Sequence, residues 1–176
     1  MSRWLKIGAA IGVIALLAVG YFVFTERGQD LLLEKLTSAA AAATFPPAVD
    51  GLRVFMCGTA SPMTTNGTAQ ACEALIPGDR KFVVDAGADS AGVAAVGRTP
   101  LEDLEAVLLT HFHSDHIAAL YDFNLNSWVA GRSAPLTVLG PVGVDQIVEG
   151  MNDAYALDRG YRVAHHGADL LPPELG

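Results

Sequence analysis

The feature that most constrains this chain is the run of residues 111–116, which reads His-Phe-His-Ser-Asp-His. Three of the five histidines fall in this run. It directly follows the apolar residues 106–110, which are predicted to form a buried strand. Imidazole nitrogens and carboxylate oxygens are typical ligands of zinc and similar divalent metals. Open α/β folds place their binding sites at the ends of strands, so the run predicts a metal site.

The spacing of these ligands indicates two metal ions rather than one. His111 and His113 are two residues apart, so on an extended chain their side chains face the same side and can bind one ion. Asp115 and His116 come after the chain has begun to turn, and they can reach a second ion nearby. The alternative interpretation is a polar loop with solvent-exposed histidines.

The motif resembles the His-x-His-x-Asp-His signature of the metallo-β-lactamase superfamily, which residues 110–116 match at every signature position. Residues 55–62 resemble the first strand and loop of the ribonuclease Z-like branch, and residues 82–87 resemble its strand ending in Asp-x-Gly. That branch includes transfer-RNA 3′-processing nucleases and sulfatase-like hydrolases. The resemblance covers residues 52–160.

The resemblance implies an α/β fold, namely the N-terminal half of a four-layer αββα sandwich. It also implies that His111 and His113 bind the first of two divalent ions, expected to be zinc. Asp115 and His116 would bind the second ion, and Asp85 would steady the site from behind. Asp115 would also be catalytic, because it could orient or deprotonate the attacking water. Such a site would hydrolyse an ester, lactone, amide or phosphodiester.

The remaining ligands of the family pattern are not apparent after residue 116. The family places a third histidine, a bridging aspartate and a late histidine there. His165 and His166 form the only later histidine pair. One of them could be a missing ligand, or both could lie at the polar end of a helix, where histidine is electrostatically favoured. We therefore expect a chain truncated within its catalytic domain, with a real but incomplete metal site.

The N-terminal residues predict a membrane anchor. Residues 7–24 carry no charged side chain, and a spanning helix needs about 17 to 25 apolar residues. Bulky residues 21–24 close this stretch, whereas a cleaved signal peptide would end near small residues. Arg3 and Lys6 precede it, which predicts a cytoplasmic N-terminus and an extracytoplasmic domain.

The sequence is thus expected to contain three parts: a transmembrane anchor (1–25), a juxtamembrane helix with an Ala/Pro stalk (26–50), and the metallo-β-lactamase-like domain (51–176). Apolar periodicity and turn residues predict the elements of that domain. The strands are expected over residues 52–56, 69–76, 81–85, 106–110 and 136–139, and the helices over 90–96, 117–129 and from 142 onward. A further helix start is expected at residues 99–102, where proline would occupy the first helical position.

Half of a sandwich would leave one apolar face of its sheet without a covering layer. We expect that face to contain Val54, Met56, Phe82, Val84, Val107 and Leu109. Contiguous exposed apolar surface marks an interface or an aggregation liability. A missing second half, or a second copy in a homodimer, would have to cover it.

The charge balance argues against nucleic acid as a partner. The chain has 19 acidic and 11 basic side chains, so no basic footprint for nucleic acid is visible. Together with the predicted export, this favours a membrane-anchored hydrolase of a small molecule. The alternatives are a ribonuclease Z-type phosphodiesterase, iron-based sulfur oxidation, and a non-catalytic metal-binding membrane protein.

Two cysteines, Cys57 and Cys72, flank a turn-rich loop. They could pair in an oxidising compartment. They could equally be free buried thiols, because sequence does not give the Cα separation that a disulfide requires.

Overall fold

The computed structural model describes residues 4, 12, 16, 19–31, 35, 50–63, 67–97, 99 and 101–176. The chain divides into two compact units, Met1–Thr44 and Phe45–Gly176. In the first unit, residues 19–24 and 26–31 are helical. The finer division of the chain at residues 25 and 50 stays a prediction.

The prediction of a membrane anchor is corrected by the described part of the first unit. No helix there combines the length and the apolar composition that a membrane crossing requires. The helical residues 19–24 end at Thr25, whose hydroxyl donates to the Tyr21 carbonyl and accepts from the Gly28 amide. Most of the predicted span, residues 7–24, lies outside the described residues. The predicted transmembrane helix is not found among the described residues, and the extracytoplasmic location that was inferred from it is corrected with it.

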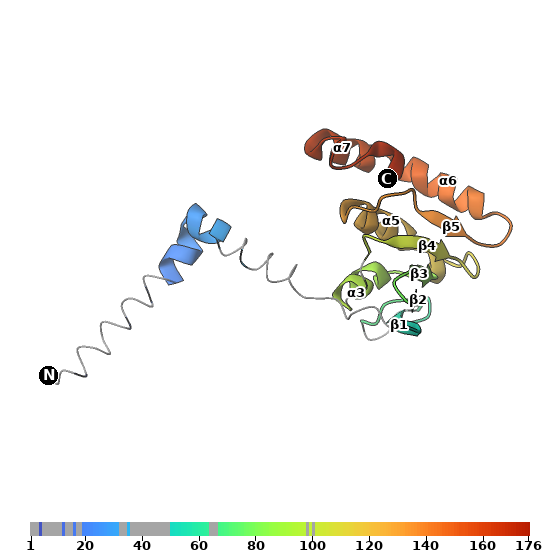
Figure 1. The fold of residues 1–176 in the computed structure, drawn as a ribbon, viewed down its shortest axis with the longest axis horizontal. Coiled ribbons are helices and arrows are strands. Elements are labelled where there is room, and N and C mark those ends of the chain that lie inside the picture. The colour runs from blue at the N-terminus through green and yellow to red at the C-terminus, as the bar shows by residue number, and fades with distance from the viewer. Residues whose placement is uncertain are drawn as a thin grey trace. The chain divides into compact units, whose positions relative to one another are not determined.

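The second unit is built on a five-stranded mixed sheet in which the strands follow one another in chain order. The strands are β1 (Leu52–Gly58), β2 (Cys72–Pro77), β3 (Lys81–Val84), β4 (Leu104–Leu108) and β5 (Thr137–Leu139). The first three strands pair antiparallel as a meander, whereas β3, β4 and β5 pair parallel. Figure 1 shows this order from β1 to β5, with α6 beside β5.

Helices connect and follow the parallel strands. They are α3 (Ser90–Val96), α4 (Ser114–Ile117), α5 (Leu120–Val129), α6 (Val144–Ala154) and α7 (Ala156–His166), followed by the 3-10 turn η1 (Pro173–Leu175). The predicted helix over 90–96 is confirmed, whereas the one predicted over 117–129 is two helices, α4 and α5. The expected helix start at residues 99–102 is wrong. Buried Leu101 accepts a turn hydrogen bond from Leu104, so β4 begins before a helix can form.

The helices cover one face of the sheet. Val83 and Val107 from the strands are fully buried there with Ala94 of α3 and Phe123 of α5. Helix α6 packs against the margin of this core through partly buried side chains such as Ile147. The core therefore fixes β3 and β4 rigidly from behind, which matters because the candidate site lies at their carboxyl ends.

The opposite face of the sheet is apolar and open in the described part of the chain. Val54 and Met56 are 53% and 49% exposed. The prediction was wrong for Val107 and Leu109, which are buried on the helix side. Parallel pairing sets Phe82 opposite Ala106 and Val84 opposite Leu108, so Ala106 and Leu108 lie on that face instead, Leu108 partly exposed and Ala106 buried.

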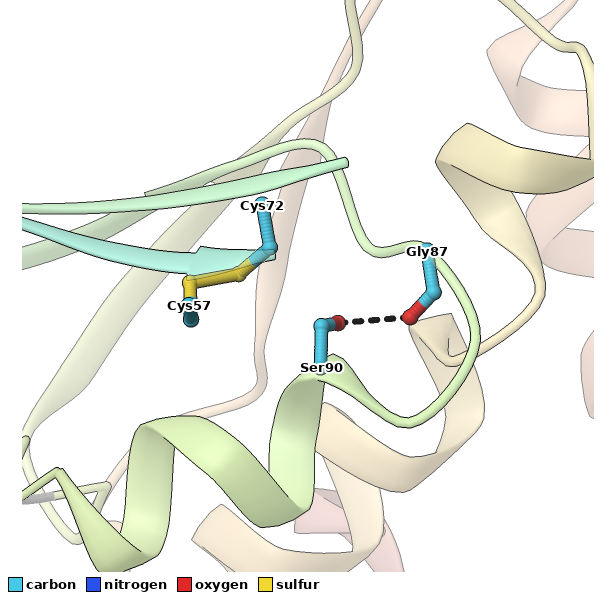
Figure 2. Close-up of a disulfide and its surroundings, with 4 residues drawn as sticks. All are labelled: Cys57, Cys72, Gly87 and Ser90. Atoms are coloured by element: carbon cyan, nitrogen blue, oxygen red, sulfur yellow. Dashed lines mark hydrogen bonds between the residues drawn. A yellow bond between two sulfur atoms is a disulfide. The ribbon is translucent and has the colours of Figure 1, made fainter. Parts of the chain in front are cut away.

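A disulfide joins β1 to β2 at the end of the strand pair. Cys57 and Cys72 have Cα atoms 5.0 Å apart and are both buried. Figure 2 shows this bridge at the ends of the two strands, near the turn through Gly87 that leads to Ser90 of α3. The two cysteines are therefore paired. The bridge fixes the start of β2, whose neighbour Ala71 accepts a hydrogen bond from Gly87 in the turn beside the candidate site.

Replacing Cys57 and Cys72 together by serine should lower the free energy of unfolding by about 3 kcal/mol. The bridge closes a loop with a sequence separation of 15, and its removal frees the unfolded chain. Urea denaturation followed by circular dichroism would measure the change. The wild-type chain in excess dithiol should show the same loss, and an unchanged midpoint in both would contradict the prediction.

Candidate metal centre

The candidate site forms where β3 and β4 end. Asp85 directly follows β3, and Thr110 begins the motif shortly after β4. Because the two strands are parallel, their carboxyl ends lie at the same edge of the sheet. The Asp85 amide donates to the Leu108 carbonyl at 2.8 Å, which continues the strand pairing into the site. Residues 25 positions apart in sequence are thereby brought into contact.

Three imidazole rings gather in this segment. The ring centroid of His111 lies 4.5 Å from that of His113 and 4.0 Å from that of His116. The His111 Nε2 and His113 Nδ1 atoms are 3.0 Å apart. Two nitrogen ligands of one tetrahedral zinc ion, each 2.0–2.1 Å from it, would be separated by about 3.3 Å. These two nitrogens therefore have nearly the separation of donors that share an ion.

A second donor pair lies beside the first. The His116 Nε2 atom is 3.5 Å from Asp115 Oδ2. Asp115 is only 5% exposed, and its Oδ1 atom is buried without a hydrogen-bond partner in the described structure. Leaving a buried carboxylate oxygen unpaired is unfavourable. A divalent cation at this position would offset that cost, so the donors present fit a metal ion.

The Asp85 carboxylate connects the two donor pairs. It accepts hydrogen bonds from the Thr110 amide (2.8 Å), from the Thr110 hydroxyl (2.8 Å to Oδ2) and from His116 Nδ1 (2.7 Å). The residue has φ of 60°, a left-handed conformation that costs a non-glycine residue about 1–3 kcal/mol. The hydrogen bonds hold the carboxylate in place despite that strain. A role for Thr110 was not foreseen from the sequence, although its position at the end of a strand parallel to that of Asp85 was a usable signal.

Backbone packing holds the motif against the turn after Asp85. The Ala86 amide donates to the His116 carbonyl at 2.7 Å. A Cβ atom on Gly87 would lie 2.3 Å from the Asp115 carbonyl oxygen, so only glycine fits there. The Ser90 hydroxyl donates to the Gly87 carbonyl at 2.6 Å, as Figure 2 shows. The turn and the motif therefore form one unit.

His165 and His166, the two later histidines, belong to neither donor pair. They are exposed at the end of α7, where their ring centroids are 4.6 Å apart. Helix α7 is held to α5 by the Tyr121 hydroxyl, which donates to Asp158 at 2.8 Å. Across the described residues, no three His, Cys, Asp or Glu side chains converge to hold one ion. Neither histidine therefore completes a donor pair.

The site opens onto the uncovered face of the sheet. A hollow of about 390 Å³ lies beside it. Its lining includes Met56, Thr59, Glu73, Val84, Asp85 and His116. The more exposed donors, including His113, face solvent at the rim, while Asp115 is buried. The donors at the rim are therefore accessible from this face in the described part of the chain.

Comparison with known proteins identifies the relationship. Residues 73–169, which include both donor pairs, match the metallo-beta-lactamase superfamily. The chain belongs to this superfamily. The resemblance inferred from the His-x-His-x-Asp-His motif is therefore confirmed, and so is the mixed α/β class of the fold.

Curated relatives that match this chain include ribonuclease Z proteins. The chain is 42% identical over 133 residues to ribonuclease Z of Mycobacterium bovis, covering 70% of this chain and 45% of that protein. It is also 42% identical over 133 residues to ribonuclease Z of Mycobacterium marinum, covering 70% and 46%. The chain thus spans less than half the length of these relatives.

Solved structures agree on the fold. The human tRNase Z short form has a TM-score of 0.51 and 20% sequence identity, covering 58% of this chain and 39% of that one. At this level of identity the likeness concerns the fold alone. It supports the arrangement of the β-sheet and helices described above.

The prediction about partners was wrong. Relatives named ribonuclease Z overturn the argument that nucleic acid is an improbable partner for a chain like this one. The argument rested on the net charge of −8, which averages over the whole chain and does not report on a local surface. Its second support, the predicted membrane anchor, is not found in the described residues.

Substitution of His111 by alanine should abolish zinc uptake at the first donor pair. A closed zinc site has about four protein donors, and His111 and His113 supply two of them. The chain should therefore bind zinc weakly, and loss of one more donor should abolish binding. Isothermal calorimetry would measure the uptake. His165→Ala is the matched control and should leave it unchanged, whereas undiminished uptake by His111→Ala would remove the motif from the metal site.

Proposed function

We propose that this chain is a metal-dependent phosphodiesterase of the ribonuclease Z type that hydrolyses a phosphodiester bond in RNA. The observation that carries the proposal is the 42% identity to ribonuclease Z relatives. The superfamily match spans both donor pairs, which lie together at the carboxyl ends of β3 and β4. The chain covers only 45% of the length of the first relative. The activity of that whole protein is therefore a proposal for this chain.

The donor pairs have distinct roles in this proposal. His111 and His113 would hold one divalent ion, expected to be zinc, and Asp115 and His116 would hold the second. When bound, such ions lower the pKa of water and neutralise the charge that develops on phosphoryl oxygens. Asp85 would keep His116 oriented, because a ligand imidazole is directed by the hydrogen bond at its other nitrogen.

The residues of the chain perform the remaining steps. The Asp115 carboxylate is buried, and with one oxygen on the ion the other would orient the attacking water or accept its proton. The exposed rim at His113 and the open hollow beside Asp85 leave room for a polymer backbone. A phosphodiester within a long RNA needs this kind of open approach, since it cannot enter a closed cavity.

The test is RNA cleavage by the chain supplied with zinc. A labelled transfer-RNA precursor should be cut, and Asp115→Ala should lower the rate by at least about 100-fold, because the proton-transfer group is lost. His166→Ala is the matched control and should cleave at the wild-type rate.

Two outcomes would contradict the proposal. One is turnover of an ester or lactone with no cleavage of RNA. The other is a chain that has taken up zinc, shown by calorimetry, and still leaves both structured and unstructured RNA intact.

A further inference from the structure

The Thr110 hydroxyl lies between two groups of the candidate site. Its Oγ1 atom is 2.8 Å from Asp85 Oδ2 and 3.0 Å from Asp85 Oδ1. The same oxygen is 3.0 Å from Nδ1 of His111. A threonine hydroxyl has one proton to donate and lone pairs that accept. The identity of the proton donor in each contact therefore decides the chemistry of His111.

The hydrogen-bonding capacities of the groups settle the direction of each bond. An ionised carboxylate only accepts, so the Thr110 hydroxyl donates to Asp85. A lone pair of Oγ1 then faces His111, and the Nδ1 atom of His111 must carry its ring proton. The Nε2 atom is left with a free lone pair, and it is the nitrogen that lies 3.0 Å from His113 Nδ1.

We propose that Thr110 is a positioning residue that relays Asp85 to His111 and fixes the tautomer in which His111 presents Nε2 as a metal donor. Asp85 acts on His116 directly and on His111 through Thr110. One carboxylate thereby orients a histidine of each donor pair. The inference rests on the proposed function only in taking His111 and His116 as metal ligands.

The geometry also predicts that the effect of Thr110 is selective. The Thr110 backbone amide donates to Asp85 Oδ1 at 2.8 Å, and this bond survives any change of side chain. Asp85 would therefore stay in place and keep its bond to His116 when the hydroxyl is removed. Loss of the hydroxyl should disturb His111 and spare His116.

The first test measures the tautomer directly in the metal-free chain. Nitrogen-15 NMR of the histidine rings, at alkaline pH where free imidazoles are neutral, should show His111 with its proton on Nδ1. Thr110→Val, which keeps the shape and removes the hydroxyl, should give a mixture of tautomers at His111, and at His113 whose Nδ1 faces His111 Nε2, but not at His116. Thr110→Ser should restore the single tautomer, and Thr137→Val, at an exposed position on β5, should change nothing.

The second test measures metal affinity. Titration with cobalt(II), followed by its ligand-field absorption, should show Thr110→Val binding the ion of the His111 pair about 10–100-fold more weakly. Thr110→Ser should bind like the wild type. The ion of the Asp115 pair should bind with unchanged affinity in both variants.

Several results would overturn the inference. They are a wild-type His111 protonated on Nε2, an unchanged His111 tautomer in Thr110→Val, or equal loss of affinity for both ions. The wild-type tautomer decides the matter even when Thr110→Val fails to fold. Failure of RNA cleavage with the predicted tautomer intact would count against the proposed function and leave this inference standing.

Discussion

The carboxylate of Asp85 is the interaction on which the rest of the candidate site depends. It accepts hydrogen bonds from the Thr110 amide, the Thr110 hydroxyl and His116 Nδ1. The hydroxyl connects Asp85 to His111 of the first donor pair, the bond from His116 connects it to the second, and the amide anchors the carboxylate. A histidine ligand is useful only when the correct nitrogen faces the ion, and the hydrogen bond at the other nitrogen decides which one does. The site is thus organised from behind by one acidic side chain.

The fold holds that carboxylate where the motif needs it. Parallel pairing of β3 and β4 brings Asp85 beside residue 110, and the helix-covered core keeps both strands in register. Asp85 itself adopts a strained left-handed conformation, which the surrounding hydrogen bonds stabilise. Gly87 lets the turn pack directly on the backbone of the motif, and the disulfide between Cys57 and Cys72 fixes the adjoining strand ends. Strain and close packing of this kind are typical of functional sites.

Much of this architecture could be predicted from local patterns. The helix over 90–96 and the strand before the motif depend on short-range periodicity, and both are present, the strand two residues earlier than predicted. The assignment of metal ligands within the motif stays a prediction. The wrong predictions involved longer-range or averaged information. Val107 was assigned to the wrong face of the sheet because the sequence of one strand does not determine its register with the next, here that of β4 with β3. The link through Thr110 needed the spatial pairing of two strand ends, and net charge could not report on a local surface.

The central claim is that Asp85 organises both donor pairs, and the most direct test is the metal content of Asp85→Asn. Asparagine tolerates the left-handed conformation and keeps the size of the side chain. Its single acceptor oxygen cannot replace both carboxylate oxygens, because its NH2 group must face either the Thr110 amide or His116 Nδ1. Equilibrium dialysis against graded zinc concentrations should show about 10–100-fold weaker binding of both ions in a variant with the wild-type circular dichroism spectrum. Retention of either ion with wild-type affinity would contradict the account.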